Sequence, residues 1–476
     1  MDKISLKVLV DKEKNRVVFA ESGSDFVEAL FGFLTIPMAI MLKLARNRSQ
    51  TVGISCVHNL YESVYNIDVN LFRNEACREM LLSPHNASES FCEKSKMKDL
   101  YVKNTNYFYR CSVYSLSKCK LLSHYRHSRC KCGNPMSNNI QVARPSSASQ
   151  KGGVLIKRNT RFVISDDLEV MSLSDGTRFS FLSKLGVMDC SSIEEWNFNV
   201  KPEEVLDMLL CSLVSRRPLT ETLLKNKPAP VNDPVNDLNQ LSTLQMEKEN
   251  IEDGNITIKL IVSKSKKLVC YAEANENCVN LLFSFLTVPF GHILKQNYNG
   301  SSNGCIDHLY TSAQDLDEQC FISSCHKEML VSPMLAPYLS CKEDLLGIKE
   351  ASYPQYYHLP VYGDSLITDI SSIPRIASVT VLDPKSGEGF LSGQAMFTVT
   401  DSLVIRPISP ILSLSILNEM KVPSNDIEER IVHVGKEEAL RLLQTSFVSE
   451  SALTNAFIRN QKQRKEETTH IIHQRN

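Results

Sequence analysis

The feature that most constrains this chain is a stretch of forty residues that occurs twice. The first copy runs from Ile4 to Lys43 and the second from Ile256 to Lys295. They align without a gap and have identical residues at 17 of 40 positions. Further matches follow in the same order along the chain: Leu60–Ser63 with Leu309–Ser312, Phe162–Leu168 with Phe397–Leu403, and Glu203–Leu206 with Glu437–Leu440. Because an internal repeat builds the same supersecondary unit each time, the sequence predicts two homologous repeats.

Each copy has the pattern of a hairpin followed by an apolar helix. In the first copy, apolar residues alternate with others across Ile4–Val10, which is typical of a half-buried strand. The polar turn Asp11–Asn15 leads to a second short strand, so an antiparallel hairpin is expected. The run Phe26–Leu34 is apolar on most of its circumference and should form a buried helix, with Asp25 and Glu28 suited to cap its first turn. We therefore predict an α+β fold in which each repeat is a small hairpin-containing sheet packed with helices.

Length and composition indicate an ordinary globular chain. Its 476 residues are enough for two or more domains, and 42% hydrophobic with 22% charged residues is a usual balance. The apolar run Ala29–Leu42 is too short to cross a bilayer, so no membrane segment is expected. The first residues carry frequent charges and no apolar signal core, which indicates a cytoplasmic or nuclear protein that is not secreted. The 15 cysteines would then be thiols or metal ligands rather than disulfides.

The repeats and the composition between them suggest a domain map. We assign residues 1–225 to the first repeat and residues 256–458 to the second. The segment 226–255 is rich in proline, asparagine and acids and is interpreted as a linker, and 459–476 is a polar tail. The first repeat also carries a basic, cysteine-rich insertion at about 94–152, and the corresponding part of the second repeat has no such cysteines.

Four cysteines in or near this insertion could bind a metal ion. Four thiolates are enough for a tetrahedral zinc ion, and the candidate ligands are Cys111, Cys119, Cys130 and Cys132. The last two lie in a Cys-x-Cys-Gly turn that resembles a zinc knuckle, and His124 and His127 are substitute ligands. The spacing differs from the two CxxC pairs of a standard ribbon, so a set of unpaired thiols is the alternative. We predict one structural zinc ion in a zinc-ribbon-like insertion, local to the first repeat.

Positive charge is concentrated in the same region. Between Lys94 and Arg161 there are 15 basic residues and one acid, Asp99, which gives a local charge of +14 in a chain of net charge −1. Cations that neutralise phosphates, interleaved with aromatic rings that stack on bases, are typical of a nucleic-acid-binding surface. The basic residues at its centre are Lys118, Lys120, Arg126, Arg129 and Lys131. A solvated basic loop is the simpler alternative.

Several of these segments resemble a known family. The opening stretch, the segment Phe397–Ser409 and the helices expected at Glu203–Leu206 and Glu437–Leu440 are similar to plant proteins of the domain-of-unknown-function family 674. The resemblance implies a cysteine-rich knuckle in the first half, which maps onto the four cysteines named above. The family has no established activity, so the resemblance implies a layout and no mechanism.

These observations favour a non-enzymatic interaction protein with an unidentified protein partner. Two fused repeats would present two related surfaces, and no convergent set of catalytic groups is visible in the sequence. The paired residues Tyr61 and Tyr310 are interpreted as packing residues rather than catalytic ones. Nucleic-acid binding through the basic region is a second hypothesis, and an enzyme of unknown type is a third.

Overall fold

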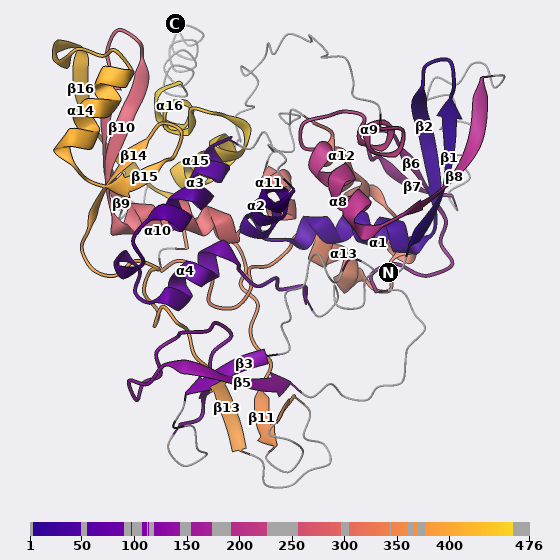
Figure 1. Cartoon of the computed structure of the whole chain (residues 1–476), viewed down its shortest axis with the longest axis horizontal. Coiled ribbons are helices and arrows are strands. Elements are labelled where there is room, and N and C mark those ends of the chain that lie inside the picture. The colour runs from indigo at the N-terminus through magenta and orange to yellow at the C-terminus, as the bar shows by residue number, and fades with distance from the viewer. Residues whose placement is uncertain are drawn as a thin grey trace, which may run out of the picture.

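The chain forms two α/β lobes that lie side by side above a smaller β-structure (Figure 1). The computed structural model describes residues 3–48, 55–89, 97, 107–111, 113, 119–142, 154–173, 192–225, 256–296, 304–342, 344–359, 365–368 and 377–459. The predicted mixture of helices and sheets is confirmed, with three sheets and helices packed around them. Within the described residues, no helix combines the length and the apolar character needed to cross a membrane.

Each lobe is built on a five-stranded antiparallel sheet. Lobe one has the strand order β7-β6-β2-β1-β8. Its strands are β1 (Ile4–Asp11), β2 (Arg16–Ser22), β6 (Phe162–Ser165), β7 (Val170–Ser172) and β8 (Ile193–Val200). Lobe two has the order β15-β14-β10-β9-β16. Its strands are β9 (Ile256–Ser263), β10 (Leu268–Asn275), β14 (Met396–Thr400), β15 (Ile405–Pro407) and β16 (Ile427–Val434). Strands whose sequences match take the same place in the two sheets.

The first hairpin follows the alternation in its sequence. Ile4, Leu6 and Val8 in β1 are at most 2% exposed, whereas Ser5 and Lys7 between them face solvent. β1 pairs with β2 as an antiparallel hairpin, and β9 pairs with β10 in the same way. Period-two alternation therefore decided which face of these strands packs against the helices.

The apolar helices that follow the hairpins are buried in their own lobes. These are α1 (Ser24–Gly32) and α10 (Glu276–Ser284). The predicted capping of α1 by Asp25 is not observed, because the N-cap is Gly23 and it has no side-chain cap. Glu28 is instead buried, and its Oε1 accepts hydrogen bonds of 2.7, 2.8 and 2.9 Å from the backbone N–H groups of residues 154, 155 and 156. A residue expected to serve its own helix thus anchors a distant segment.

The helices that cover each lobe come partly from the opposite half of the chain (Figure 1). In the first half they are α2 (Met38–Asn47), α3 (Ser55–Asn66), α4 (Glu75–Leu82), α8 (Pro202–Cys211) and α9 (Pro218–Leu223). In the second half they are α11 (Phe290–Gln296), α12 (Ile306–Asp315), α13 (Ser324–Val331), α14 (Pro410–Glu419), α15 (Lys436–Val448) and α16 (Ala452–Thr454). α3 packs on α10 and α15 in lobe two, whereas α12 packs on α1 and β7 in lobe one.

Short helical turns connect several of these elements. They are η1 (Phe33–Thr35), η2 (Val69–Leu71), η3 (Phe285–Thr287), η4 (Glu318–Cys320), η5 (Ser424–Asp426) and η6 (Asn455–Arg459). Pro37 and Pro289, which follow η1 and η3, lie opposite each other in an isolated antiparallel bridge where the two lobes meet. The prolines that end the two repeated apolar runs therefore mark the centre of the molecule.

The third sheet is shared by the two halves and has the order β3-β5-β12-β11-β13-β4. Its strands are β3 (Tyr107–Cys111), β4 (Leu121–Leu122), β5 (Met136–Val142), β11 (Tyr356–Leu359), β12 (Ser365–Ile367) and β13 (Ala377–Val381). Two parallel pairs, β5 with β12 and β4 with β13, join the halves. Tyr109 and Ser123 exchange backbone hydrogen bonds of 2.7 and 2.8 Å, which links the first strand to the last and closes a small barrel.

The barrel has its own apolar core, and both halves contribute to it. Its buried members are Phe108, Leu122, Ile140, Leu366, Val379 and Val381. Above the barrel, one continuous hydrophobic core runs through both lobes. The two predicted units are therefore interleaved, and the described strands of the 94–152 insertion belong to the shared barrel rather than to a free-standing ribbon. The exact boundaries stay a prediction, since the linker 226–255 and residues 460–476 of the tail lie outside the described residues.

Candidate metal centre

The four predicted cysteine ligands gather at one end of the barrel. Cys111 is the last residue of β3, Cys119 lies shortly before β4, and Cys130 and Cys132 lie in the connection from β4 to β5. The connection turns sharply at Gly133, which donates its N–H to the carbonyl of Cys130 at 2.8 Å and has a φ of +86°. Glycine suits this left-handed conformation because it lacks a Cβ. The Cys-x-Cys-Gly turn brings its two sulfur atoms back towards β3.

The distances between sulfur atoms match those of a tetrahedral thiolate site. Cys119 Sγ lies 3.4 Å from Cys111 Sγ and 3.2 Å from Cys130 Sγ. Cys132 Sγ lies 3.9 Å from Cys111 Sγ. Four sulfurs bound to zinc at about 2.3 Å would be separated by about 3.8 Å. Among the described residues, Cys111, Cys119 and Cys130 form the one buried group of potential metal-binding side chains within 4.8 Å of one another, and Cys132 adds a fourth thiol.

The four thiols differ in exposure and acidity. Cys111, Cys119 and Cys130 are buried, whereas Cys132 is exposed. Burial raises the pKa of Cys130 to about 12 and also raises the pKa of Cys111. The side-chain amide of Asn134, 3.4 Å from Cys132 Sγ, is the main cause that lowers the pKa of Cys132 to about 6. A bound cation would supply the positive charge that the buried thiols need in order to ionise.

Neither substitute histidine belongs to this cluster. The ring of His124 stacks between Phe108 and His85, with centroid distances of 4.5 and 3.6 Å, and its Nδ1 is 2.9 Å from the hydroxyl of Tyr353. His127 Nδ1 instead lies 3.9 Å from a carboxylate oxygen of Glu75. The histidines therefore have other contacts, and the group that could hold a metal ion is made of cysteines.

The comparisons with known proteins agree with the resemblance found in the sequence. The family model described as "Protein of unknown function (DUF674)" matches residues 1–437 and 425–476. The chain belongs to the DUF674 family. No curated protein and no solved structure matches it. The suspected family is thus confirmed, and the functional argument for this DUF674 protein rests on its own geometry.

The second half of this DUF674 protein borders the cysteine cluster. Leu382, which follows β13, packs against the cluster together with Met136 and Tyr109. The N–H groups of Thr380 and Leu382 donate to the carbonyls of residues 120 and 122, at 3.0 and 2.7 Å. The sequence predicted a structural zinc site that is local to the first half. All four thiols do come from that half, but the loops they would tie together are bonded to the second half.

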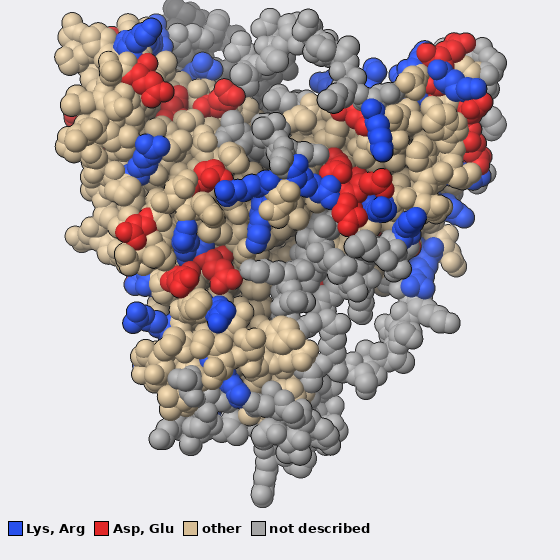
Figure 2. Space-filling view, in the orientation of Figure 1, with Lys and Arg blue, Asp and Glu red and all other residues tan. Residues whose placement is uncertain are grey.

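The basic residues predicted to bind nucleic acid lie close to the cysteines in the chain. Lys120, Arg126, Arg129 and Lys131 are exposed, and Lys118 lies outside the described residues. The described aromatic residues give limited support for base stacking, because Phe108 and Tyr125 are buried, although Tyr107 is exposed. Figure 2 shows both signs of charge interspersed over the two lobes on the face that it draws. The cysteine-bearing loops therefore offer cations but few stacking surfaces.

Proposed function

We propose that this DUF674 protein is a non-enzymatic interaction protein whose central barrel is held together by one structural zinc ion. The ligands are Cys111, Cys119, Cys130 and Cys132. The observation that carries the proposal is the convergence of these thiols at spacings that suit tetrahedral zinc. Because they lie at the end of β3 and in the connections on either side of β4, a single ion would hold β3, β4 and β5 in register.

The role of the ion would be structural rather than catalytic. A catalytic zinc site keeps one coordination position open for water or substrate, and a structural site uses four protein ligands. Here four thiols are available, and three of them are buried under Met136, Tyr109 and Leu382. This arrangement supports a closed site whose binding free energy stabilises the barrel.

Metal analysis of the full-length protein tests this proposal. We expect about one zinc ion per chain, in line with a single four-thiol site. Cys132→Ser should release most of the zinc and lower the thermal midpoint, because it removes the ligand that is most readily ionised. Cys325→Ser is the matched control, since Cys325 is also an exposed free thiol and lies far from the cluster in the sequence. It should leave the zinc content unchanged.

Two outcomes would contradict the proposed zinc site. One is a folded, full-length protein that contains no metal after purification in zinc-supplemented buffer. The other is a Cys132→Ser variant that keeps its zinc as firmly as the parent protein. Either result would leave the four cysteines as unpaired thiols, which is the alternative interpretation of their sequence.

The duplicated architecture and two exposed apolar side chains support the proposed role as an interaction protein. Matching segments of the two halves build sheets of the same strand order, which favours descent of the two lobes from one duplicated unit. Two large apolar side chains on α14, Ile411 and Leu414, are 80% and 68% exposed. Exposed apolar residues of this size favour contact with another protein, and we keep a protein as the proposed class of partner.

Nucleic-acid binding is the second candidate, favoured by the exposed basic residues of the barrel loops. The test is salt-titrated binding of a single-stranded oligonucleotide to the zinc-loaded, full-length protein. A variant with alanine at Lys120, Arg126, Arg129 and Lys131 should bind more weakly and show a shallower dependence on salt, because about four phosphate contacts would be lost. The control variant carries alanine at Lys14, Lys201, Lys264 and Arg406, which are exposed elsewhere. Equal binding by both variants would end this hypothesis.

A further inference from the structure

The two halves of the chain complete each other's lobes. α3 of the first half covers α10, α15 and β15 of lobe two, and α12 of the second half covers α1 and β7 of lobe one. α10 is buried on nearly all sides, so it needs α3 as well as its own sheet to exclude water. The same holds for α1 and α12. Each lobe is thus a composite of both halves.

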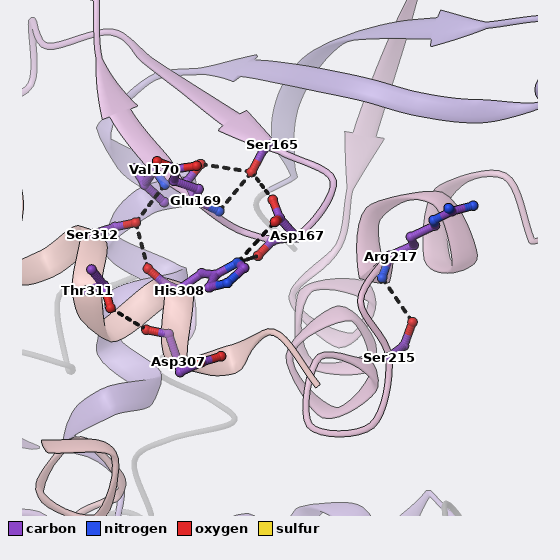
Figure 3. Close-up of polar contacts among 10 residues, drawn as sticks. All are labelled: Ser165, Asp167, Glu169, Val170, Ser215, Arg217, Asp307, His308, Thr311 and Ser312. Carbon is purple, nitrogen blue, oxygen red and sulfur yellow. Dashed lines mark hydrogen bonds and ion pairs between the residues drawn. The ribbon is translucent and has the colours of Figure 1, made fainter. Parts of the chain in front are cut away.

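At equivalent positions in the two lobes, a serine side chain of one half accepts a hydrogen bond from the backbone of the other half. Ser312 of α12 accepts the N–H of Val170 at 2.8 Å, and Ser63 of α3 accepts the N–H of Ile405 at 2.9 Å. Figure 3 shows the first of these contacts, with Ser312 pointing from α12 to the backbone of Val170 in lobe one. Both serines are buried, and both belong to the matched segments Leu60–Ser63 and Leu309–Ser312. The contact therefore occurs twice, each time between halves.

The segments whose backbone N–H groups are bound by Glu28 of α1 and Asn280 of α10 also pair across the halves. Ile156 forms an antiparallel bridge with Phe321, and Leu391 forms one with Phe72. Around the first bridge, Ile322 donates its N–H to the carbonyl of residue 155 at 3.1 Å. Around the second, Arg73 donates to the carbonyl of residue 390 at 2.9 Å. The bridging residues Ile156, Phe321, Phe72 and Leu391 are all buried. Separating the halves would therefore break backbone pairing inside the core, which is costly.

A third set of contacts lies between the lobes at the two prolines. Met38 donates its N–H to the carbonyl of Val288 at 3.0 Å, and Phe290 donates to Ile36 at 2.9 Å. The rings of Phe33 and Phe290 meet edge-on with centroids 5.5 Å apart. The two parallel strand pairs of the barrel are a fourth set of contacts that joins the halves.

We infer that each half is the obligate binding partner of the other, so that the protein is a fused heterodimer whose halves stay associated without a covalent connection. The shared core, the exchanged helices and the barrel are then an interface of the obligate kind, which resembles a domain core divided in two. This inference does not rest on the proposed zinc ion, since α3, α12 and the proline contacts lie outside the barrel.

Cleavage of the folded, full-length protein tests the inference. A recognition site for a sequence-specific protease is placed within residues 226–255, and the purified protein is cut under native conditions. We expect the two fragments to co-elute with the mass of the intact chain, 53.7 kDa. The thermal midpoint of the cut protein should fall on dilution, because unfolding becomes coupled to dissociation. Fragments that separate at micromolar concentration into two independently folded species would overturn the inference.

A pair of serine variants shows whether the exchanged helices contribute to this association. Ser312→Ala removes an acceptor that lies between the halves, and it should raise the dissociation constant of the cut protein by at least about fivefold. Ser284→Ala is the control, because buried Ser284 donates to the carbonyl of Leu281 within α10 itself. It should change the dissociation constant less. An unchanged constant in both variants would overturn the role assigned to the exchange.

Discussion

The two lobes make the same contacts with different side chains. In lobe one, the carboxylate of Glu28 accepts three backbone N–H groups, from residues 154, 155 and 156. In lobe two, the neutral amide of Asn280 accepts two, from Phe390 and Leu391. Asn280 is shorter, and the segment approaches it so closely that a Cβ on Gly389 would lie 2.1 Å from its side-chain nitrogen. Val154 occupies the matching position in lobe one.

A second difference lies where the exchanged helices dock. Within lobe one, His308 of α12 forms an ion pair of 3.1 Å with Asp167, so the contact joins the second half of the chain to the first (Figure 3). At the matching place in lobe two, the amide of Asn59 donates to the carbonyl of Ser402 at 2.9 Å. At these two matched contacts, lobe one uses ionisable side chains and lobe two uses neutral ones. The backbone contact itself therefore does not require a charged pair, and the pH dependence of this particular docking contact belongs to lobe one.

The largest effect is expected from removing the buried acceptors. Glu28→Ala should lower the free energy of unfolding by about 3–5 kcal/mol, because three N–H groups lose their acceptor. Asn280→Ala, the matched change in lobe two, should cost about 2–3 kcal/mol, because only two N–H groups are affected. Denaturant unfolding of both variants measures the difference. A larger loss for Asn280→Ala would show that the carboxylate adds nothing beyond a neutral acceptor, as burial raises the pKa of Glu28.

The smallest effect on stability is expected at the ion pair between His308 and Asp167, and it should depend on pH. The hydrogen bond to Asp167 raises the pKa of His308 above its usual 6.5, despite burial. The stabilisation is therefore complete below about pH 6.5 and is lost as the pH rises through the folded-state pKa. His308→Asn, which copies Asn59, should cost about 0.5 kcal/mol at pH 6, a value reduced for partial exposure, and nothing at pH 9. Unfolding at the two pH values measures this, and an equal cost at both would contradict it.

Local patterns in the sequence predicted local structure well. The alternation from Ile4 to Val10 gave the buried face of β1, and the duplicated stretch gave two hairpins followed by buried helices. The four cysteines were chosen from ligand type and number alone. The structure places Cys111, Cys119 and Cys130 within 4.8 Å of one another, with Cys132 Sγ 3.9 Å from Cys111 Sγ. These features depend on residues that are close in the chain or chemically distinctive, so a single sequence is enough to find them.

The long-range arrangement could not be read in this way. The apolar faces of α3 and α12 show that each is covered, but they do not show which half of the chain covers it. The sequence also gives no sign that β4 pairs with β13, because parallel strands are not joined by a short turn that would set their register. Glu28 was interpreted as a capping residue, since a capping glutamate and one that binds a distant backbone look alike in sequence. His124 was a candidate ligand because it lies among the cysteines in the sequence. Its stacking on Phe108 could not be predicted, since no local pattern indicates it.

The exchange of helices also has a consequence for synthesis on the ribosome. When residues 1–225 have emerged, the face of α1 that α12 covers is still bare, because α12 begins at Ile306. The strand partner of Ile156 is likewise not yet made. Lobe one can therefore complete its folding only after roughly a hundred further residues have been translated, and until then its uncovered apolar surface is accessible to chaperones. Its maturation is therefore timed by the arrival of the carboxyl-terminal portion.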